Sequence, residues 1–200
     1  MADLFVDKAA DWDTRPVPVQ IAQGVGAALR ARVPLRADLR VLDFGAGTGL
    51  LCAQVAPQVA VVYAVDISEA MLAKLAAKPE LAGKVEVRCQ DLLAQPLGHP
   101  VDLIVSAMAM HHVQDTAALV RAFAAHLVSG GRIALADLDR EDGTFHAPGT
   151  EGVFHHGFDR DALRGLLTDA GFTDIEIATA TRVDRDQRGY DVFLVTAVRR

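Results

Sequence analysis

The sequence contains few cysteines, few aromatic residues and no long apolar run. Only two of its 200 residues are cysteine and 6% are aromatic. Cys52 and Cys89 lack the spacing of a disulfide framework or a zinc-binding pair, which favours small buried residues in a reducing cytoplasm. No apolar stretch has the length of a membrane span, and the acidic start MADLFVDKAADWD does not resemble a secretory signal. We therefore expect a cytoplasmic protein without membrane association.

An excess of positive charge is also absent. The chain carries 26 acidic and 20 basic residues, a net charge of −6. Because nucleic-acid-binding domains usually present a basic face, this balance argues against a nucleic-acid partner. A length of 200 residues and an apolar content of 51% fit a single globular domain, residues 1–200, with a substantial core. No feature of the sequence predicts an oligomeric state.

The chain alternates between strand-like and helix-like segments. Ser68 is expected to cap one helix, and Gly130 and Gly131 to end another. The first helix carries prolines in its first turn, where a missing N–H group costs little. Strands are expected at residues 39–45, 59–66, 84–91, 101–107 and 131–139 and in two segments after residue 171. Helices are expected at residues 17–32, 49–56, 69–78, 115–128 and 159–170.

This alternation predicts an α/β fold in which helices cover both faces of a mostly parallel sheet. The continuously apolar strands agree, because parallel strands are buried on both sides. The last two strands have no helix between them and are expected to form an antiparallel pair at one edge. In such open sheets ligands bind beyond the carboxyl ends of the strands, so the loops that follow the strands are the first place to look for a site.

A glycine-rich turn follows the first predicted strand in VLDFGAGTGL. Gly45, Gly47 and Gly49 alternate with other residues, and glycine lets the backbone turn sharply and approach a ligand closely. A tight turn without a ligand is the simpler alternative. The pattern is one residue shorter than the dinucleotide fingerprint G-x-G-x-x-G. Asp43 stands in front of it, where a carboxylate suits an ammonium group better than a pyrophosphate.

Two further acidic residues follow the next two strands. Asp66 ends the second strand, where an acid can accept hydrogen bonds from both hydroxyls of a ribose. Asp91 follows the third strand, where its carboxylate can accept from an adenine amine while Leu92 offers its backbone N–H to the ring. Three acids after three consecutive strands, together with the glycine turn, fit a positively charged adenosine ligand.

The segments VLDFGAGTGLL, AVDISEAML, VEVRCQDLL and VDLIVSAMAMHHV resemble, in order and spacing, those of class I S-adenosylmethionine-dependent methyltransferases. The resemblance covers roughly the first two thirds of the chain. It implies a Rossmann-like three-layer sandwich with a seven-stranded, mostly parallel sheet whose last strand is antiparallel. It also implies S-adenosyl-L-methionine as the cofactor and S-adenosyl-L-homocysteine as its product. The cofactor-binding residues that it implies are Asp43, Gly45, Ala46, Gly47, Gly49, Asp66, Ile67, Met71, Asp91, Leu92, Ser106 and Ala107.

In this family the residues that precede the sheet often fold over the cofactor. Residues 1–35 are therefore interpreted as a helical lid region, and Trp12 as a cofactor-binding residue within it. The alternative is that Trp12 is an ordinary aromatic residue that packs the N-terminal helix onto the sheet.

Candidate catalytic residues follow the fourth and fifth strands. The activated methyl donor requires mainly alignment and exclusion of water, and a base helps only if the acceptor must lose a proton. His111 and His112 are candidates, because imidazole titrates near neutrality; one of them is expected to hold the loop. Asp137, at the end of the fifth strand, is expected to face the substrate, as is Asp139.

A long irregular stretch, residues 139–158, follows the fifth strand. Loops of this length are uncommon in compact domains and often form lids or binding sites. Its acids and histidines include the ligand types of a metal site, but their spacing matches no metal motif, so no metal is predicted. A solvated polar loop is the simplest interpretation. Because exposed aromatics are costly, Phe145, Phe154 and Phe158 favour a loop that folds back over the acceptor site.

The function that the sequence predicts is methyl transfer from S-adenosylmethionine to a small-molecule acceptor. Two alternatives stay open at this point. One is an NAD(P)-dependent oxidoreductase on a related sheet, against which the short glycine spacing and Asp91 argue. The other is a non-catalytic module that binds S-adenosylmethionine. The sequence leaves the acceptor open, because oxygen, nitrogen and carbon acceptors all occur on this fold.

Overall fold

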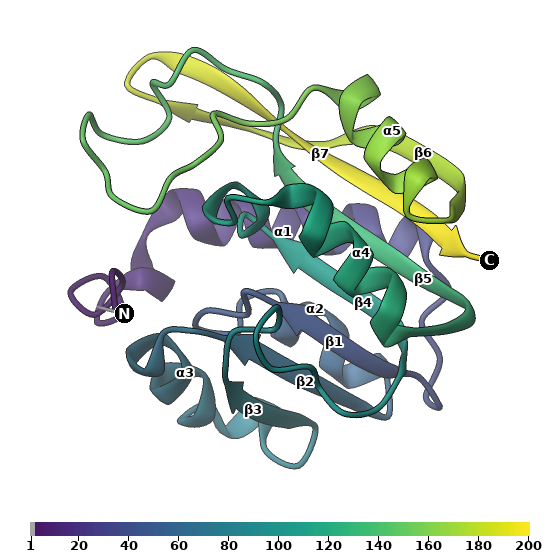
Figure 1. Cartoon of the computed structure of the whole chain (residues 1–200). Helices are drawn as coiled ribbons and strands as arrows, with labels where there is room; N and C mark the ends of the chain where they lie inside the picture. Colours follow the sequence, from purple (N-terminus) through teal and green to yellow (C-terminus); the bar gives the residue numbers. More distant parts are fainter. Residues whose placement is uncertain (1–2) are drawn as a thin grey trace.

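A computed structural model describes residues 3–200 and contains a seven-stranded sheet in the order β3-β2-β1-β4-β5-β7-β6 (Figure 1). Neighbouring strands from β3 to β5 pair in parallel, whereas β7 runs antiparallel to both β5 and β6. The predicted fold class and the antiparallel pair at one edge are therefore confirmed. The strands are β1 (Arg40–Phe44), β2 (Val61–Asp66), β3 (Val85–Cys89), β4 (Val101–Ala107), β5 (Leu127–Leu138), β6 (Phe172–Arg185) and β7 (Arg188–Arg199).

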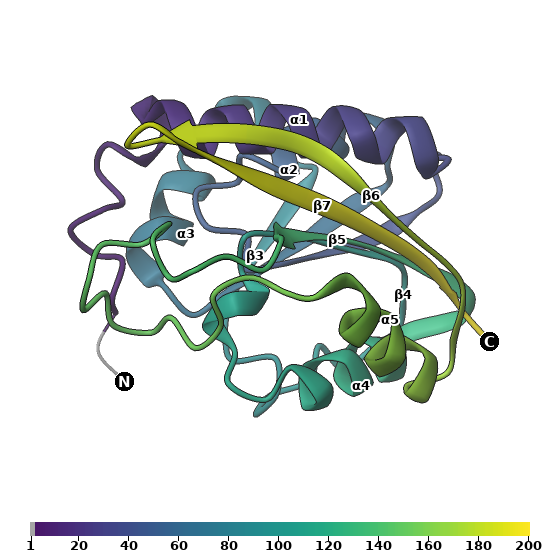
Figure 2. The same ribbon diagram turned by 90° about the horizontal axis from the view of Figure 1, so that it is seen from above.

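Helices cover both faces of the sheet and make three layers (Figure 2). One apolar cluster joins the sheet to α1 (Pro16–Arg32), α2 (Cys52–Val55) and α3 (Glu69–Ala76). A second cluster joins the opposite face to α4 (Thr116–His126) and α5 (Arg160–Asp169). The 3₁₀ helices are η1 (Trp12–Thr14), η2 (Ala56–Gln58), η3 (Pro79–Leu81) and η4 (Met110–His112).

Three helices begin near the carboxyl ends of the strands with a side-chain cap. The Ser68 hydroxyl accepts from the N–H of Met71 at 3.2 Å, which confirms its predicted cap on α3. Asp115 and Asp159 cap α4 and α5 in the same way. Each cap satisfies an N–H group that the first helical turn leaves unpaired.

Two predicted helix boundaries are wrong. The glycine turn and Pro57 leave room for only one α-helical turn, so the helix expected at 49–56 shrinks to α2 and η2. The helix expected at 115–128 ends at His126, and Gly130 and Gly131 lie inside β5. The pairing of β5 with β4 shifts register over these glycines, and Gly130 has φ +75°, so they form an irregularity in the strand rather than a helix stop.

The chain between β5 and α5 contains no helix and only an isolated bridge between Asp139 and Phe158. Phe145 and Phe158 are buried in it, whereas Phe154 is 52% exposed. Two of the three aromatic side chains therefore anchor the loop, as expected from their cost in water.

The two cysteines differ in their surroundings. Cys52 is buried at the start of α2, but Cys89 is exposed at the end of the edge strand β3, so its expected burial is wrong. None of the helices in the described part of the chain combines the length and the apolar composition of a membrane-spanning helix.

Candidate active site

The glycine turn after β1 lies against the end of β2 and against the residue that precedes η4. The N–H groups of Gly45 and Ala46 donate to the carbonyl of Val65 at 2.9 and 3.1 Å. A Cβ atom on Gly45 would lie 2.2 Å from that of Ala109, so only glycine fits there. Around Gly47, with φ +54°, a Cβ would meet nothing within 4 Å. The turn therefore presents open backbone to a ligand at Gly47.

Asp43 is a buried carboxylate in β1, next to this turn. The Sγ atom of Cys52 donates to it at 3.1 Å. Burial raises the pKa of Asp43 to about 7, because the charged form loses its hydration, and the charge of Asp66 adds to the effect. A ligand cation would compensate this buried charge, so the site fits the ammonium group of an amino acid moiety. Cys52 was not predicted as a partner of Asp43; its place in the first turn after the glycines is the only sequence signal.

Asp66, at the end of β2, holds the turn and the start of α3 together. Its carboxylate accepts from the N–H of Gly47 at 2.8 Å and from that of Ser68 at 2.9 Å. Burial raises the pKa of Asp66, while these two hydrogen bonds oppose the rise. Each carboxylate oxygen has a second lone pair, so Asp66 can still accept from two ribose hydroxyls.

The other predicted cofactor residues surround this pair of acids at the same edge of the sheet. The third glycine of the turn, Gly49, has φ +83° and packs against Leu75 of α3. The remaining residues of the set differ in exposure. Ile67 is 63% exposed, Met71 and Leu92 are buried, Asp91 is exposed and accepts from the N–H of Leu93, and Ala107 is half-buried. Ser106 is buried, and its hydroxyl donates to the carbonyl of Phe44 at 2.8 Å.

The N-terminal segment, residues 3–14, crosses this edge of the sheet (Figure 1). Its Asp3 carboxylate accepts from the Ser68 hydroxyl at 2.8 Å, and Asp13 pairs with Lys78 at 2.6 Å. Phe5 stacks edge-on against both Trp12 and His112, with ring centroids 6.2 and 5.3 Å apart. Trp12 packs within this segment and belongs to neither core cluster. Residues 1–2 of the expected lid region lie outside the described residues.

His111 and Asp137 form a buried pair beyond β4 and β5. The Nδ1 atom of His111 lies 2.7 Å from Oδ1 of Asp137, and both side chains are at most 1% exposed. The backbone N–H of His111 also donates to Asp137, at 3.2 Å. Because a carboxylate oxygen accepts, the neutral imidazole would carry its hydrogen on Nδ1 and a lone pair on Nε2. That Nε2 atom is buried and has no hydrogen-bond partner within residues 3–200.

His112 and His146 complete a group of three imidazoles with His111, here called the histidine cluster. The ring centroid of His111 lies 4.1 Å from that of His112 and 5.0 Å from that of His146. Nδ1 of His112 donates to the carbonyl of Gly152 at 2.6 Å, so this histidine holds the loop. Burial, reinforced by the neighbouring imidazoles, lowers the pKa of both His112 and His146 to about 4. Both are therefore neutral at pH 7.

The sequence did not indicate that His146 joins His111. The loop leaves β5 directly after Asp137 and turns back across the end of its own strand, which no local pattern shows. Asp139, which was expected to face the substrate, instead forms a salt bridge with Arg160 at 2.7 Å. Of the two acids only Asp137 therefore lies at the histidine cluster. Within residues 3–200, no group of three histidine, cysteine or acidic side chains is arranged to hold a metal ion.

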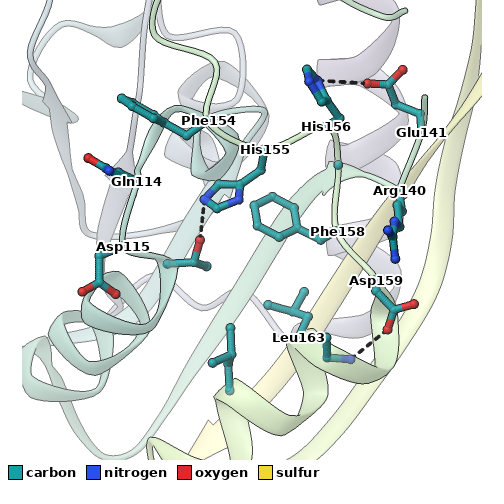
Figure 3. A pocket seen from close by; sticks show the side chains of 14 residues that line it. Gln114, Asp115, Arg140, Glu141, Phe154, His155, His156, Phe158, Asp159 and Leu163 are labelled. Atoms are coloured by element: carbon teal, nitrogen blue, oxygen red, sulfur yellow. Dashed lines mark hydrogen bonds and ion pairs between the residues drawn. The ribbon is translucent and has the colours of Figure 1, made fainter. Parts of the chain in front are cut away.

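A separate groove of about 660 Å³ lies between the loop and the beginnings of α4 and α5 (Figure 3). His155 and His156, which the sequence left unassigned, line it together with Phe158. Nε2 of His155 lies 3.1 Å from the Thr116 hydroxyl, whereas His156 points toward Glu141, 3.7 Å away. The N–H groups of Phe154 and His155 bond to the carbonyl of His111, so this wall of the groove is attached to the histidine cluster.

Comparison with known proteins places the fold and the site in context. The sequence model of the family described as "Methyltransferase domain" matches residues 19–177. The chain belongs to this methyltransferase family. An uncharacterized methyltransferase of Geobacillus sp. is 32% identical over 157 residues, 70% of this chain and 73% of the relative. A ubiquinone biosynthesis O-methyltransferase of Xylella fastidiosa is 38% identical over 114 residues, 54% of this chain.

A solved structure supports the same fold. The magnesium protoporphyrin IX methyltransferase of Synechocystis, crystallised with bound S-adenosylhomocysteine, superimposes with a TM-score of 0.72. The superposition covers 99% of this chain and 97% of the Synechocystis chain. At 22% sequence identity, the similarity supports the fold alone. The chain spans less than two thirds of several curated relatives that it matches, for example 45% of the Xylella protein and 56% of a Schizosaccharomyces pombe relative.

These findings confirm the resemblance to class I S-adenosylmethionine-dependent methyltransferases and make S-adenosylmethionine the cofactor of the family. The oxidoreductase alternative is thereby set aside. The residues present fit this cofactor. The buried carboxylate of Asp43 would be stabilised by a cation, and the backbone of the turn has free space around Gly47. The assignment of individual residues to cofactor and acceptor stays a prediction.

Proposed function

We propose that this methyltransferase transfers the methyl group of S-adenosylmethionine to a hydroxyl or thiol of a small molecule, with His111 as the base. The observation that carries this proposal is the buried Nε2 atom of His111, which has no partner in the described part of the chain, while Nδ1 of the same ring faces Asp137. The relatives that are named as O-methyltransferases support an oxygen acceptor. A base is useful for such acceptors, because a neutral hydroxyl is a weak nucleophile.

For the cofactor, we assign Asp43 to the ammonium group, Asp66 to the ribose and the turn around Gly47 to the methionine part. Ile67 and Met71 would flank the adenine, Asp91 and Leu92 would read its edge, and Ser106 and Ala107 would line the floor. When bound, the cofactor would supply a methyl group on a positively charged sulfur, which would pass to the acceptor's oxygen or sulfur as its bond to the cofactor's sulfur breaks. Residues of this chain would accept the proton of the acceptor, position the loop and exclude water.

His111 accepts the acceptor's proton at Nε2, and the carboxylate of Asp137 stabilises the imidazolium that results. The proton leaves to solvent after transfer. His112 has a positioning role, because its bond to Gly152 fixes the loop beside His111. The N-terminal segment and the 139–158 loop would act as covers that exclude water, since they meet where Leu4 lies against Gly152.

The test is turnover of S-adenosylmethionine by the purified full chain with a panel of phenols and thiols, read as S-adenosylhomocysteine released. We expect release that requires both an acceptor and His111. The non-catalytic alternative predicts cofactor binding with no release for any acceptor. The His111–Asp137 pair favours turnover, because a binding module has no need of an oriented base.

A further inference from the structure

Two of the three imidazoles in the histidine cluster have a buried nitrogen that no group within residues 3–200 satisfies. Nε2 of His111 and Nε2 of His146 are both buried without a hydrogen-bond partner. Leaving a buried polar atom unpaired is destabilising, and most such atoms in proteins are paired. A ligand that satisfied both nitrogens at once would therefore gain from both.

The state of the cluster limits what that ligand can be. Nδ1 of His111 and Nδ1 of His112 each face an acceptor, the carboxylate of Asp137 and the carbonyl of Gly152. His112 and His146 are neutral at pH 7. Lys8 and Arg185 add positive charge nearby, whereas Asp137 adds negative charge, so a neutral polar ligand suits the cluster. The ring centroids of His146 and His111 lie 5.0 Å apart, close enough for one small molecule to contact both rings.

We propose that His146 selects acceptors that carry a second hydroxyl group on the atom next to the methylated one. In this arrangement His111 takes the proton of the first hydroxyl, and the second hydroxyl hydrogen-bonds to Nε2 of His146. The ligand class is a vicinal dihydroxy compound, with catechol as its simplest aromatic probe. This inference rests on the proposed function and deepens it, because it adds a specificity-determining residue on the 139–158 loop.

The site favours an organic ligand over a metal ion. Fixed, neutral imidazoles are also what a zinc site uses. However, no three suitable side chains in the described part of the chain are arranged to hold a metal. Asp137 is already engaged by the ring and the backbone N–H of His111 and by the N–H of Leu138.

The experiment compares catechol with phenol by calorimetry on the full chain saturated with S-adenosylhomocysteine. The wild-type protein should bind catechol about fivefold to tenfold more tightly than phenol, the value of one extra hydrogen bond to a buried partner. In His146→Ala the two ligands should bind within about twofold of each other. His146→Gln, which keeps a hydrogen-bonding group, should retain part of the preference. His156→Ala, on the same loop but 59% exposed, is the matched control and should keep all of it.

Three results would overturn the inference. They are equal affinities in the wild type, a preference that survives His146→Ala, and a zinc-dependent rise in melting temperature that His146→Ala removes. The wild-type comparison needs no variant, so misfolding of a variant cannot obscure it. Turnover separates the two proposals. Methylation of phenol and catechol at equal rates would leave the proposed function standing without this inference, whereas no methylation of any hydroxyl or thiol would remove the proposed function itself.

Discussion

Around β1, β2 and β3, every assigned residue lies within five positions of the end of its strand. Asp43, Gly47 and Asp66 are neighbours. The carboxylate of Asp66 accepts from the N–H of Gly47, and its charge helps to raise the pKa of Asp43. Around β4 and β5 the candidate residues come instead from η4, a strand end and a loop that turns back over the sheet. The first half, around β1–β3, is proposed to bind the cofactor with backbone and short side chains, and the second half, around β4 and β5, is assembled from distant parts of the chain.

This difference predicts a separation of effects. Substitutions around β1–β3 should change cofactor affinity, and substitutions in the histidine cluster should change methyl transfer. A variant that changed both quantities equally would show that the two halves are not independent.

The largest effect is expected from His111→Ala. Loss of a general base lowers the rate of transfer by about 10²–10⁴-fold, whereas affinity for S-adenosylhomocysteine should stay within about twofold. Single-turnover methyl transfer and calorimetry on the same preparation measure the two quantities. Asp137→Asn should reproduce most of the loss, because the amide no longer fixes the tautomer of the imidazole. A parallel fall in cofactor affinity would assign His111 to the cofactor half.

Asp66→Ala should have the converse effect. Removing a carboxylate that accepts from two ribose hydroxyls weakens binding of S-adenosylhomocysteine by about 10–100-fold. Because Asp66 also bonds Gly47 and Ser68, a melting curve must show that the variant is folded. Asp38→Ala, an exposed carboxylate paired with Arg36 at the opposite end of β1, is the control and should bind normally. Unchanged affinity in folded Asp66→Ala would refute the ribose assignment.

Asp43 should make cofactor binding depend on pH. Its pKa in the folded protein is about 7, above its ordinary value of 3.8, so the protein without ligand loses stability as pH rises from about 4 to 7. Binding of an ammonium group favours the carboxylate form, so the affinity for the ligand increases as pH rises. Affinity for S-adenosylhomocysteine should therefore rise by about tenfold between pH 6 and pH 8.

Calorimetry in buffers of different ionisation enthalpy would detect the matching proton release below pH 7. Asp43→Asn should bind more weakly and lose most of this dependence. A wild-type affinity that stays flat across this range would show that Asp43 is ionised before the ligand arrives, in which case the buried thiol of Cys52 compensates its charge sufficiently.

The same contrast explains how much could be predicted from sequence. The order of elements, the fold class and the glycine turn depend on local patterns, namely the period of apolar residues and the residue types directly after each strand. The partner of Asp43 and the place of His146 could not be predicted, because they depend on how a helix turn and a long loop pack back onto the sheet. His155 and His156 show the limit best. They are neighbours in sequence, yet one bonds α4 and the other faces Glu141.

The smallest effect is expected at Tyr190, which anchors the 139–158 loop at a distance from the proposed cofactor residues and from the histidine cluster. The Tyr190 hydroxyl lies 2.9 Å from that of Thr144, and its ring stacks edge-on against Phe145, with centroids 5.2 Å apart. Tyr190→Phe removes one hydrogen bond, worth about 0.5–1.5 kcal/mol, and keeps the stacking. The loop should then hold His146 less firmly, which raises KM for the acceptor about twofold to threefold and leaves cofactor affinity unchanged.

A drop of a few degrees in Tm would accompany this change, since about 1 kcal/mol corresponds to roughly 2–4 °C in a chain of this size. Tyr190→Ala also removes the stacking and should enlarge both effects in the same direction. If either variant weakened cofactor binding as much as acceptor binding, the loop would cover the whole edge of the sheet. The two halves would then share one closing movement, although they are built from different kinds of contact.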